Sequence, residues 1–275
     1  METAGLSVLN VQKSDHLPKL NFMKAIKGTR NARELPAKPI NSVGRIIESL
    51  MDLPTKAVLL GMADDGHPVF LDLLDFSAGS ILVISDQGYG KTHQLQVILD
   101  SAIAIKLSNN LSVFVISLNP WEWQYQLQAY EKKHVSFEYL GWQESHTIKV
   151  IKHLTEMTQD RLVDQRQSKD IILILDEVSN MRYLDEDSQV SLNFLYTSGP
   201  QARIWPFASL SADRDHPDRD MMDLFKTWIF GHVSSMPGIF FQERLDSNLV
   251  DNEPGQFSVK MEEKWFSYRL PMIGR

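Results

Sequence analysis

The sequence predicts an α/β fold with a mostly parallel central sheet flanked by helices. Three nearly continuous apolar runs have the length of a strand buried on both faces of a sheet, at residues 80–84, 112–118 and 171–175. Segments with apolar residues at helical spacing separate these runs, at residues 92–106 and 146–165. Strands that alternate with helices pack as a parallel sheet, and a chain of 275 residues is long enough for one such domain.

The chain opens with a basic segment that we expect to be an arm or linker. Residues 1–45 contain three prolines, little apolar periodicity, and eight Lys or Arg against three acids. The net charge of residues 1–45 is +5. Because the whole chain has a net charge of −7, the remaining residues together carry −12. We expect a solvated, partly disordered arm, with contact to nucleic acid or to an acidic partner as the alternative. Residues 46–275 form the expected domain.

The other elements follow from short apolar patterns and turn residues. Asp64-Asp65-Gly66 predicts the turn of a hairpin. The expected elements are a short helix at 40–51, a hairpin at 57–61 and 68–72, a fourth and a fifth strand at 203–210 and 227–233, and a closing hairpin at 256–260 and 265–270.

A phosphate-binding loop is predicted between the first apolar strand and the helix after it. P-loops follow the pattern G-x-x-x-x-G-K-[ST] between a strand and a helix; here Gly90-Lys91-Thr92 is intact and Ser85 replaces the first glycine. Lys91 is expected to contact the β and γ phosphates, and Thr92 to hold Mg²⁺. A chance match in an ordinary strand–turn–helix is the alternative. The residues expected to bind ATP are Ser85, Asp86, Gln87, Gly88, Tyr89, Gly90, Lys91, Thr92 and His93.

Two carboxylates follow the third apolar run and complete the predicted site. Asp176 and Glu177 come directly after residues 171–175. Ligands of open α/β sheets bind at the carboxyl ends of the strands, where the loop also lies. Asp176 is expected to bind Mg²⁺ through water and Glu177 to polarise the attacking water, so Glu177 and Lys91 are the candidate catalytic residues.

With both motifs in place, the chain resembles the motor domain of the FtsK/HerA family of DNA-pumping ATPases over residues 57–275. The resemblance implies a RecA-like P-loop ATPase fold. The lead-in to the P-loop and the helix before the acidic strand are the more specific parts of it. The segments that carry the resemblance are Leu60-Gly61, Gly66-His67-Pro68-Val69, Asp72-Leu73, Asn119-Pro120 with Glu122, Glu156-Met157 with Arg161, and Asp176-Glu177.

The sequence departs from the family pattern at three positions. Ser85 replaces the first P-loop glycine. The fourth strand lacks the γ-phosphate-sensing Gln of the family, which leaves Ser209 as a possible sensor. The Gly-Arg segment before that strand is Gly199-Pro200 here, and the nearby Arg203 is the candidate arginine finger, although it is not aligned with the family's arginine.

The resemblance implies a motor subunit that hydrolyses ATP with Mg²⁺ and moves double-stranded DNA through a ring-shaped homo-oligomer, a hexamer. The departures favour one alternative, a weakly hydrolysing regulatory or assembly subunit of a defence or plasmid-maintenance complex. A secretion-type motor that acts on a protein partner is the other.

The composition and the apolar pattern indicate the cellular compartment of the protein. There are no cysteines, which excludes disulfides and cysteine metal sites. The N-terminus lacks the features of a secretion signal, and no apolar stretch approaches the length of a membrane span. We expect a soluble, cytoplasmic protein without membrane contact.

An aromatic cluster follows the second apolar run. It consists of Trp121, Trp123 and Tyr125. Packing in the core or at an interface is the favoured interpretation, and contact with nucleic acid or a neighbouring subunit is the alternative.

Overall fold

The computed structural model describes residues 42–50, 56–74, 79–105, 111–131, 135–164, 169–215, 219–234, 247–261 and 264–273. The expected arm at residues 1–45 therefore lies almost wholly outside the described residues. Among the described residues, no helix combines the length and the apolar character that crossing a bilayer requires.

Within the described residues, ten strands form a single sheet in the order β2-β1-β10-β9-β8-β3-β7-β6-β4-β5. The six strands from β8 to β5 run parallel, and the antiparallel strands β1, β2, β9 and β10 extend the sheet on the β8 side. The parallel strands are β3 (Ile81–Ser85), β4 (Ser112–Ile116), β5 (Ser136–Leu140), β6 (Ile171–Leu175), β7 (Ile204–Ser211) and β8 (Thr227–Phe230). The antiparallel strands are β1 (Ala57–Met62), β2 (Pro68–Asp72), β9 (Gln256–Met261) and β10 (Lys264–Arg269).

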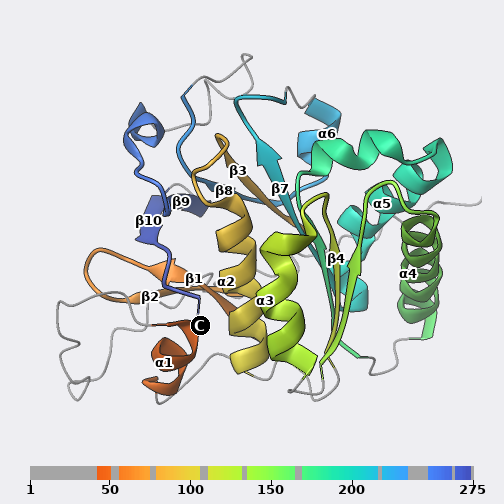
Figure 1. Ribbon diagram of the computed structural model, residues 1–275, viewed down its shortest axis with the longest axis horizontal. Coiled ribbons are helices and arrows are strands. Elements are labelled where there is room, and N and C mark those ends of the chain that lie inside the picture. Colours follow the sequence, from red (N-terminus) through yellow and green to blue (C-terminus); the bar gives the residue numbers. More distant parts are fainter. Residues whose placement is uncertain are drawn as a thin grey trace, which may run out of the picture.

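Helices cover both faces of the parallel part of the sheet (Figure 1). On one face α2 and α3 bury Leu95, Ile98 and Trp123 against the strands. On the other face α4 and α5 bury Leu154 and Leu192. The helices are α1 (Val43–Glu48), α2 (Lys91–Ala104), α3 (Pro120–Glu131), α4 (Ser145–Asp164), α5 (Glu186–Ser198) and α6 (Arg219–Asp223), with 3-10 turns η1 (Val178–Tyr183), η2 (Pro200–Ala202) and η3 (Ser247–Asp251).

The predicted α/β fold is confirmed, together with both hairpins. The sequence reasoning missed α3, β5 and α5. In α3 the exposed Trp121 and Tyr125 interrupt the apolar spacing of a surface helix. The edge strand β5 has five residues, and only Leu140 is buried. For α5 a signal was present, because the Asp185 side chain caps the helix by accepting a hydrogen bond from the Ser188 amide at 2.9 Å.

Candidate nucleotide-binding site

The predicted phosphate-binding loop connects the carboxyl end of β3 to the first turn of α2. Gly88 and Gly90 adopt φ values of 84° and 99°, which a residue with a side chain rarely adopts. Gly90 is the N-cap of α2 and offers no side-chain hydrogen bond, so the amides of the first turn point out of the helix end. This arrangement of amides and helix dipole binds anions.

Lys91 brings a buried positive charge into this loop. Its side chain is 5% exposed, and its Nζ donates hydrogen bonds to the Ser85 and Asp86 carbonyl oxygens at 3.3 and 3.2 Å. The same Nζ lies 3.3 Å from Glu177 Oε1. The loop therefore curls around an ammonium group that is already paired with the predicted catalytic carboxylate.

Ser85 occupies the position of the first P-loop glycine, and its side chain packs toward the neighbouring strand. It is the last residue of β3, is fully buried, and packs against Gly231 at the end of the β8 strand. A Cβ added at Gly231 would lie only 2.7 Å from the Ser85 Cβ. The glycine on the neighbouring strand thus makes room for the serine.

Asp176 stands at the carboxyl end of β6 among neutral hydrogen-bond donors. It is 3% exposed, and its carboxylate accepts from Ser209 Oγ at 2.8 Å, Ser117 Oγ at 3.3 Å and Trp123 Nε1 at 3.4 Å. The Thr92 hydroxyl lies 3.3 Å from Asp176 Oδ2. Burial raises the pKa of Asp176 to about 6, against the opposing effect of the Ser209 hydrogen bond. No Lys or Arg of the described residues forms an ion pair with this carboxylate.

Glu177 is held next to Asp176 by the two serines of β7. Its backbone has φ 59°, unusual for a residue with a side chain, and its amide donates to Ser209 Oγ at 2.8 Å. Ser211 Oγ donates to Glu177 Oε1 at 2.7 Å. Ser211 was not predicted, because its contact with Glu177 bridges 34 residues of sequence.

These residues fit a magnesium ion. Mg²⁺ prefers oxygen ligands and usually takes one or two carboxylates while substrate phosphates and water supply the rest. The Thr92 hydroxyl and the Asp176 carboxylate are oxygen donors in contact. The described residues contain no group of three or more His, Cys, Asp or Glu that forms a complete metal cage. The Thr92 hydroxyl and the Asp176 carboxylate suit a metal ion whose other ligands are phosphate and water.

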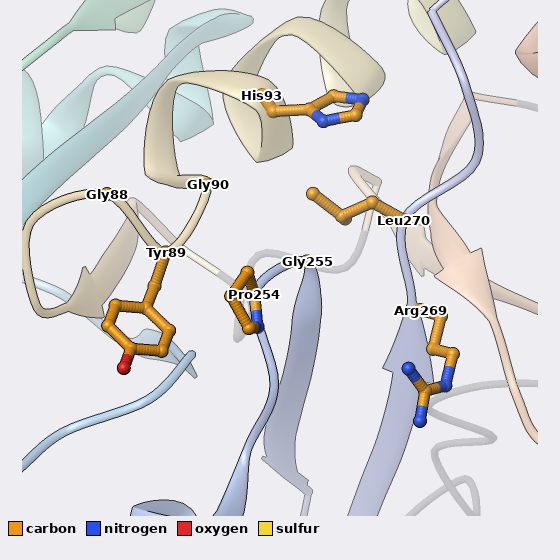
Figure 2. A pocket seen from close by; sticks show the side chains of 8 residues that line it. All are labelled: Gly88, Tyr89, Gly90, His93, Pro254, Gly255, Arg269 and Leu270. Atoms are coloured by element: carbon orange, nitrogen blue, oxygen red, sulfur yellow. The ribbon is translucent and has the colours of Figure 1, made fainter.

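A cavity of about 350 Å³ adjoins the loop (Figure 2). It lies between the start of α2 and the β9–β10 hairpin, and its volume falls in the range of small-molecule pockets. His93 on its rim contacts the Pro271 carbonyl oxygen through Nε2 at 3.0 Å, and burial lowers the His93 pKa. The lining residues are Gly88, Tyr89, Gly90, His93, Pro254, Gly255, Arg269 and Leu270. The C-terminal residues of this set were not predicted.

The two remaining predicted residues, Ser209 and Arg203, lie at opposite ends of the parallel sheet. Ser209 joins the site, because it contacts both Asp176 and the Glu177 amide. Arg203 precedes β7 and therefore lies at the end of the parallel sheet opposite to the loop, with its Nε 2.7 Å from Asp170 Oδ1. Its expected role as an arginine finger for another subunit stays a prediction.

No known protein family and no curated protein matches the chain. Among solved structures, the chain is similar to EssC (ATPases 2 and 3) from Geobacillus thermodenitrificans, with 17% identity and a TM-score of 0.60 over 81% of this chain and 48% of that one. It is also similar to the cytoplasmic domain of the type VII secretion ATPase EccC from Thermomonospora curvata, with 14% identity and a TM-score of 0.63. The match covers 85% of this chain and 32% of the EccC chain.

A third similar structure is the genome packaging NTPase B204 from Sulfolobus turreted icosahedral virus 2 in complex with ATP-γS. The identity is 8% and the TM-score 0.50, and the match covers 71% of this chain and 99% of the B204 chain. The chain spans about half or less of the length of the EssC and EccC chains. At these identities the likeness concerns the fold, and the chain has the α/β fold of P-loop ATPases.

Proposed function

We propose that the chain binds ATP with Mg²⁺ at Ser85 to His93 and hydrolyses it as the motor subunit of a ring. The observation that carries the proposal is the meeting of three groups at one end of the sheet: Lys91 Nζ lies 3.3 Å from Glu177 Oε1, and Thr92 contacts Asp176. A strand–turn–helix with a chance sequence match has no reason to assemble these groups.

Within the proposal, each side chain has a distinct part. Lys91 moves from Glu177 to the arriving β and γ phosphates, which frees the Glu177 carboxylate to accept a hydrogen bond from the attacking water. Thr92 and Asp176 would hold Mg²⁺, which neutralises charge on the phosphates. Ser209 and Ser211 keep the two carboxylates oriented.

The nucleoside part of ATP fits the cavity beside the loop. The cavity borders Gly88 and Gly90, so a chain of phosphates on the loop leads directly into it. Tyr89 stacks on His232 with ring centroids 4.1 Å apart, which fixes the wall formed by the loop. The absence of a large side chain at Gly255, where φ is 80°, keeps the opposite wall open.

We further propose that the motor moves double-stranded DNA through a hexameric ring. The support is the motif resemblance to FtsK/HerA motors and the likeness in fold to a protein described as a genome packaging NTPase. A secretion-type motor acting on a protein is the second candidate, because EccC is described as a type VII secretion ATPase. The regulatory alternative rests on Ser85, the missing sensor Gln and the unaligned arginine.

ATP turnover with and without long duplex DNA tests the proposal. We expect DNA to stimulate turnover, and Glu177→Gln to abolish it while ATP binding persists. ATP binding without turnover under both conditions would contradict the motor and support the regulatory subunit. Stimulation by a protein partner alone would support the secretion-type motor.

A further inference from the structure

An apolar groove of about 340 Å³ lies between α3 and the edge strand β5, away from the nucleotide cavity. Trp121 on its rim is 67% exposed, a large fraction for the largest apolar side chain. An exposed aromatic groove is a candidate site of interaction. The groove is lined by Pro120, Trp121, Trp123, Gln124, Leu127, Phe137 and Tyr139.

Two residues of this groove are hydrogen-bonded to the candidate metal site. Trp123 forms the floor of the groove and donates from Nε1 to Asp176 Oδ2 at 3.4 Å. Tyr139 donates from its hydroxyl to the Ser117 carbonyl oxygen at 2.7 Å, and Ser117 Oγ donates to Asp176 Oδ2 at 3.3 Å. A ligand that shifts either ring therefore acts on the carboxylate expected to hold Mg²⁺.

The surroundings of the groove are acidic. Burial raises the pKa of Tyr139 to about 12, and the negative charges of Glu144, Asp176 and Glu122 act in the same direction. Glu122 and Glu144 are exposed. The occupant that such a groove favours is an apolar segment that carries positive charge.

This chain contains such a segment in its arm. Residues 19–27 hold three lysines, no acid and four large apolar residues: Leu20, Phe22, Met23 and Ile26. The arm as a whole has a net charge of +5 against −12 for the rest of the chain. We propose that residues 19–27 of one copy dock in the α3–β5 groove of a neighbouring copy.

The arm joins the domain on the far side of the sheet from the groove of the same copy. Ser42 pairs with Met272, directly beyond β10. In the sheet, β5 lies seven strand spacings from β10, roughly 34 Å, and α2 and α3 stand on the face between them (Figure 1). A head-to-tail ring brings unlike surfaces of neighbouring copies together, so we place the docking between copies. This step rests on the proposed ring.

Disulfide trapping tests the docking directly, since the chain has no cysteine of its own. Full-length Met23→Cys and Gln124→Cys chains are mixed, oxidised, and separated without reductant. We expect a covalent dimer at about ten times the yield given by Met23→Cys with Val190→Cys, because docking raises the local concentration of the thiols. Val190 is 63% exposed on α5, on the other face of the sheet, and serves as the matched control.

A synthetic peptide of residues 17–28 distinguishes docking from charge attraction. Excess peptide should suppress the covalent dimer several-fold, while a scrambled peptide of equal composition should not. Equal dimer yields with Gln124→Cys and Val190→Cys, equal suppression by both peptides, or a disulfide that forms only within a chain carrying both cysteines would each overturn the proposal.

Light scattering of the wild-type chain separates this proposal from the proposed ring. An oligomer whose copies do not cross-link at these positions contradicts the docking and leaves the ring intact. A wild-type chain that stays monomeric with ATP and Mg²⁺ contradicts the ring, and with it the docking between copies.

Discussion

Two buried aspartates frame the strand β6, one at each end, and their surroundings differ in charge. Asp170 precedes Ile171–Leu175 and is fully buried, while Asp176 follows it and is 3% exposed. Asp170 accepts from Lys56 Nζ at 2.9 and 3.1 Å and lies 2.7 Å from Arg203 Nε. Asp176 contacts hydroxyls and an indole N–H, with no ion pair among the described residues.

The difference assigns a role to each carboxylate. Burial raises the pKa of Asp170 to about 7, against the opposing charge of Arg161, whereas the close contacts with Lys56 and Arg203 favour its charged form. Asp170 thereby ties together the starts of β1, β6 and β7. Asp176 forms no ion pair with a cationic side chain among the described residues, which leaves its carboxylate available to a divalent cation.

The largest expected effect comes from removing the charge at the carboxyl end. Asp176→Asn should lower ATP turnover about 1,000-fold, because an amide does not neutralise Mg²⁺ as a carboxylate does. Steady-state ATPase assays measure this, and Asp170→Asn is the matched control at the other end of β6. Similar losses of turnover in both variants, at a temperature where both are folded, would contradict the division of roles.

The second effect is a loss of stability at the amino end. Asp170→Asn should reduce the free energy of unfolding by about 3 kcal/mol, because Lys56 and Arg203 lose their buried counter-charge. Their side chains are 16% and 30% exposed, so partial hydration limits the loss. Urea unfolding of wild type and variant measures the difference. An unchanged midpoint would show that the ion pairs do not stabilise the fold.

The third expected effect is a pH-dependent gain in stability when Asp176 is replaced by asparagine. Its folded pKa of about 6 exceeds the ordinary value of 3.8, so the nucleotide-free wild type loses stability as the pH rises from about 4 to 6 and stays at the lower level above. Asp176→Asn removes this loss and should be about 3 kcal/mol more stable than wild type at pH 8. The advantage should vanish near pH 4. A variant that is less stable than wild type at pH 8, without Mg²⁺, would contradict the description of Asp176 as uncompensated.

The same comparison shows what the sequence could predict. The strand β6 is a continuous apolar run, so its burial and the acids after it were predictable from local pattern alone. The role of Asp170 was not, because its partners Lys56 and Arg203 precede other strands, and Lys56 lies 114 residues away along the chain. Local pattern predicts which side chains end a strand, and only tertiary contacts determine whether their charge is compensated.

The same limit applies to the missed parts of the site. The loop from Ser85 to Thr92 was predictable because its residues are consecutive and the flanking strand and helix have clear periodicity. The cavity beside it uses Gly255 and Leu270, which reach the loop only through the antiparallel end of the sheet. Neither residue has a neighbour in sequence that hints at a ligand.

The smallest expected effect concerns the orientation of Glu177, which follows Asp176 at the carboxyl end of β6. Ser211→Ala removes the hydroxyl that donates to Glu177 Oε1 at 2.7 Å. We expect kcat to fall about tenfold, since a hydrogen bond to a charged group contributes roughly 1.5–3 kcal/mol. The affinity for ATP should stay within about twofold, because the Ser211 hydroxyl donates its hydrogen bond to the Glu177 carboxylate. Ser211→Thr keeps the hydroxyl and should restore most of kcat. A variant that loses ATP affinity as strongly as kcat, or one that threonine does not rescue, would mean that Ser211 supports the loop rather than the orientation of Glu177.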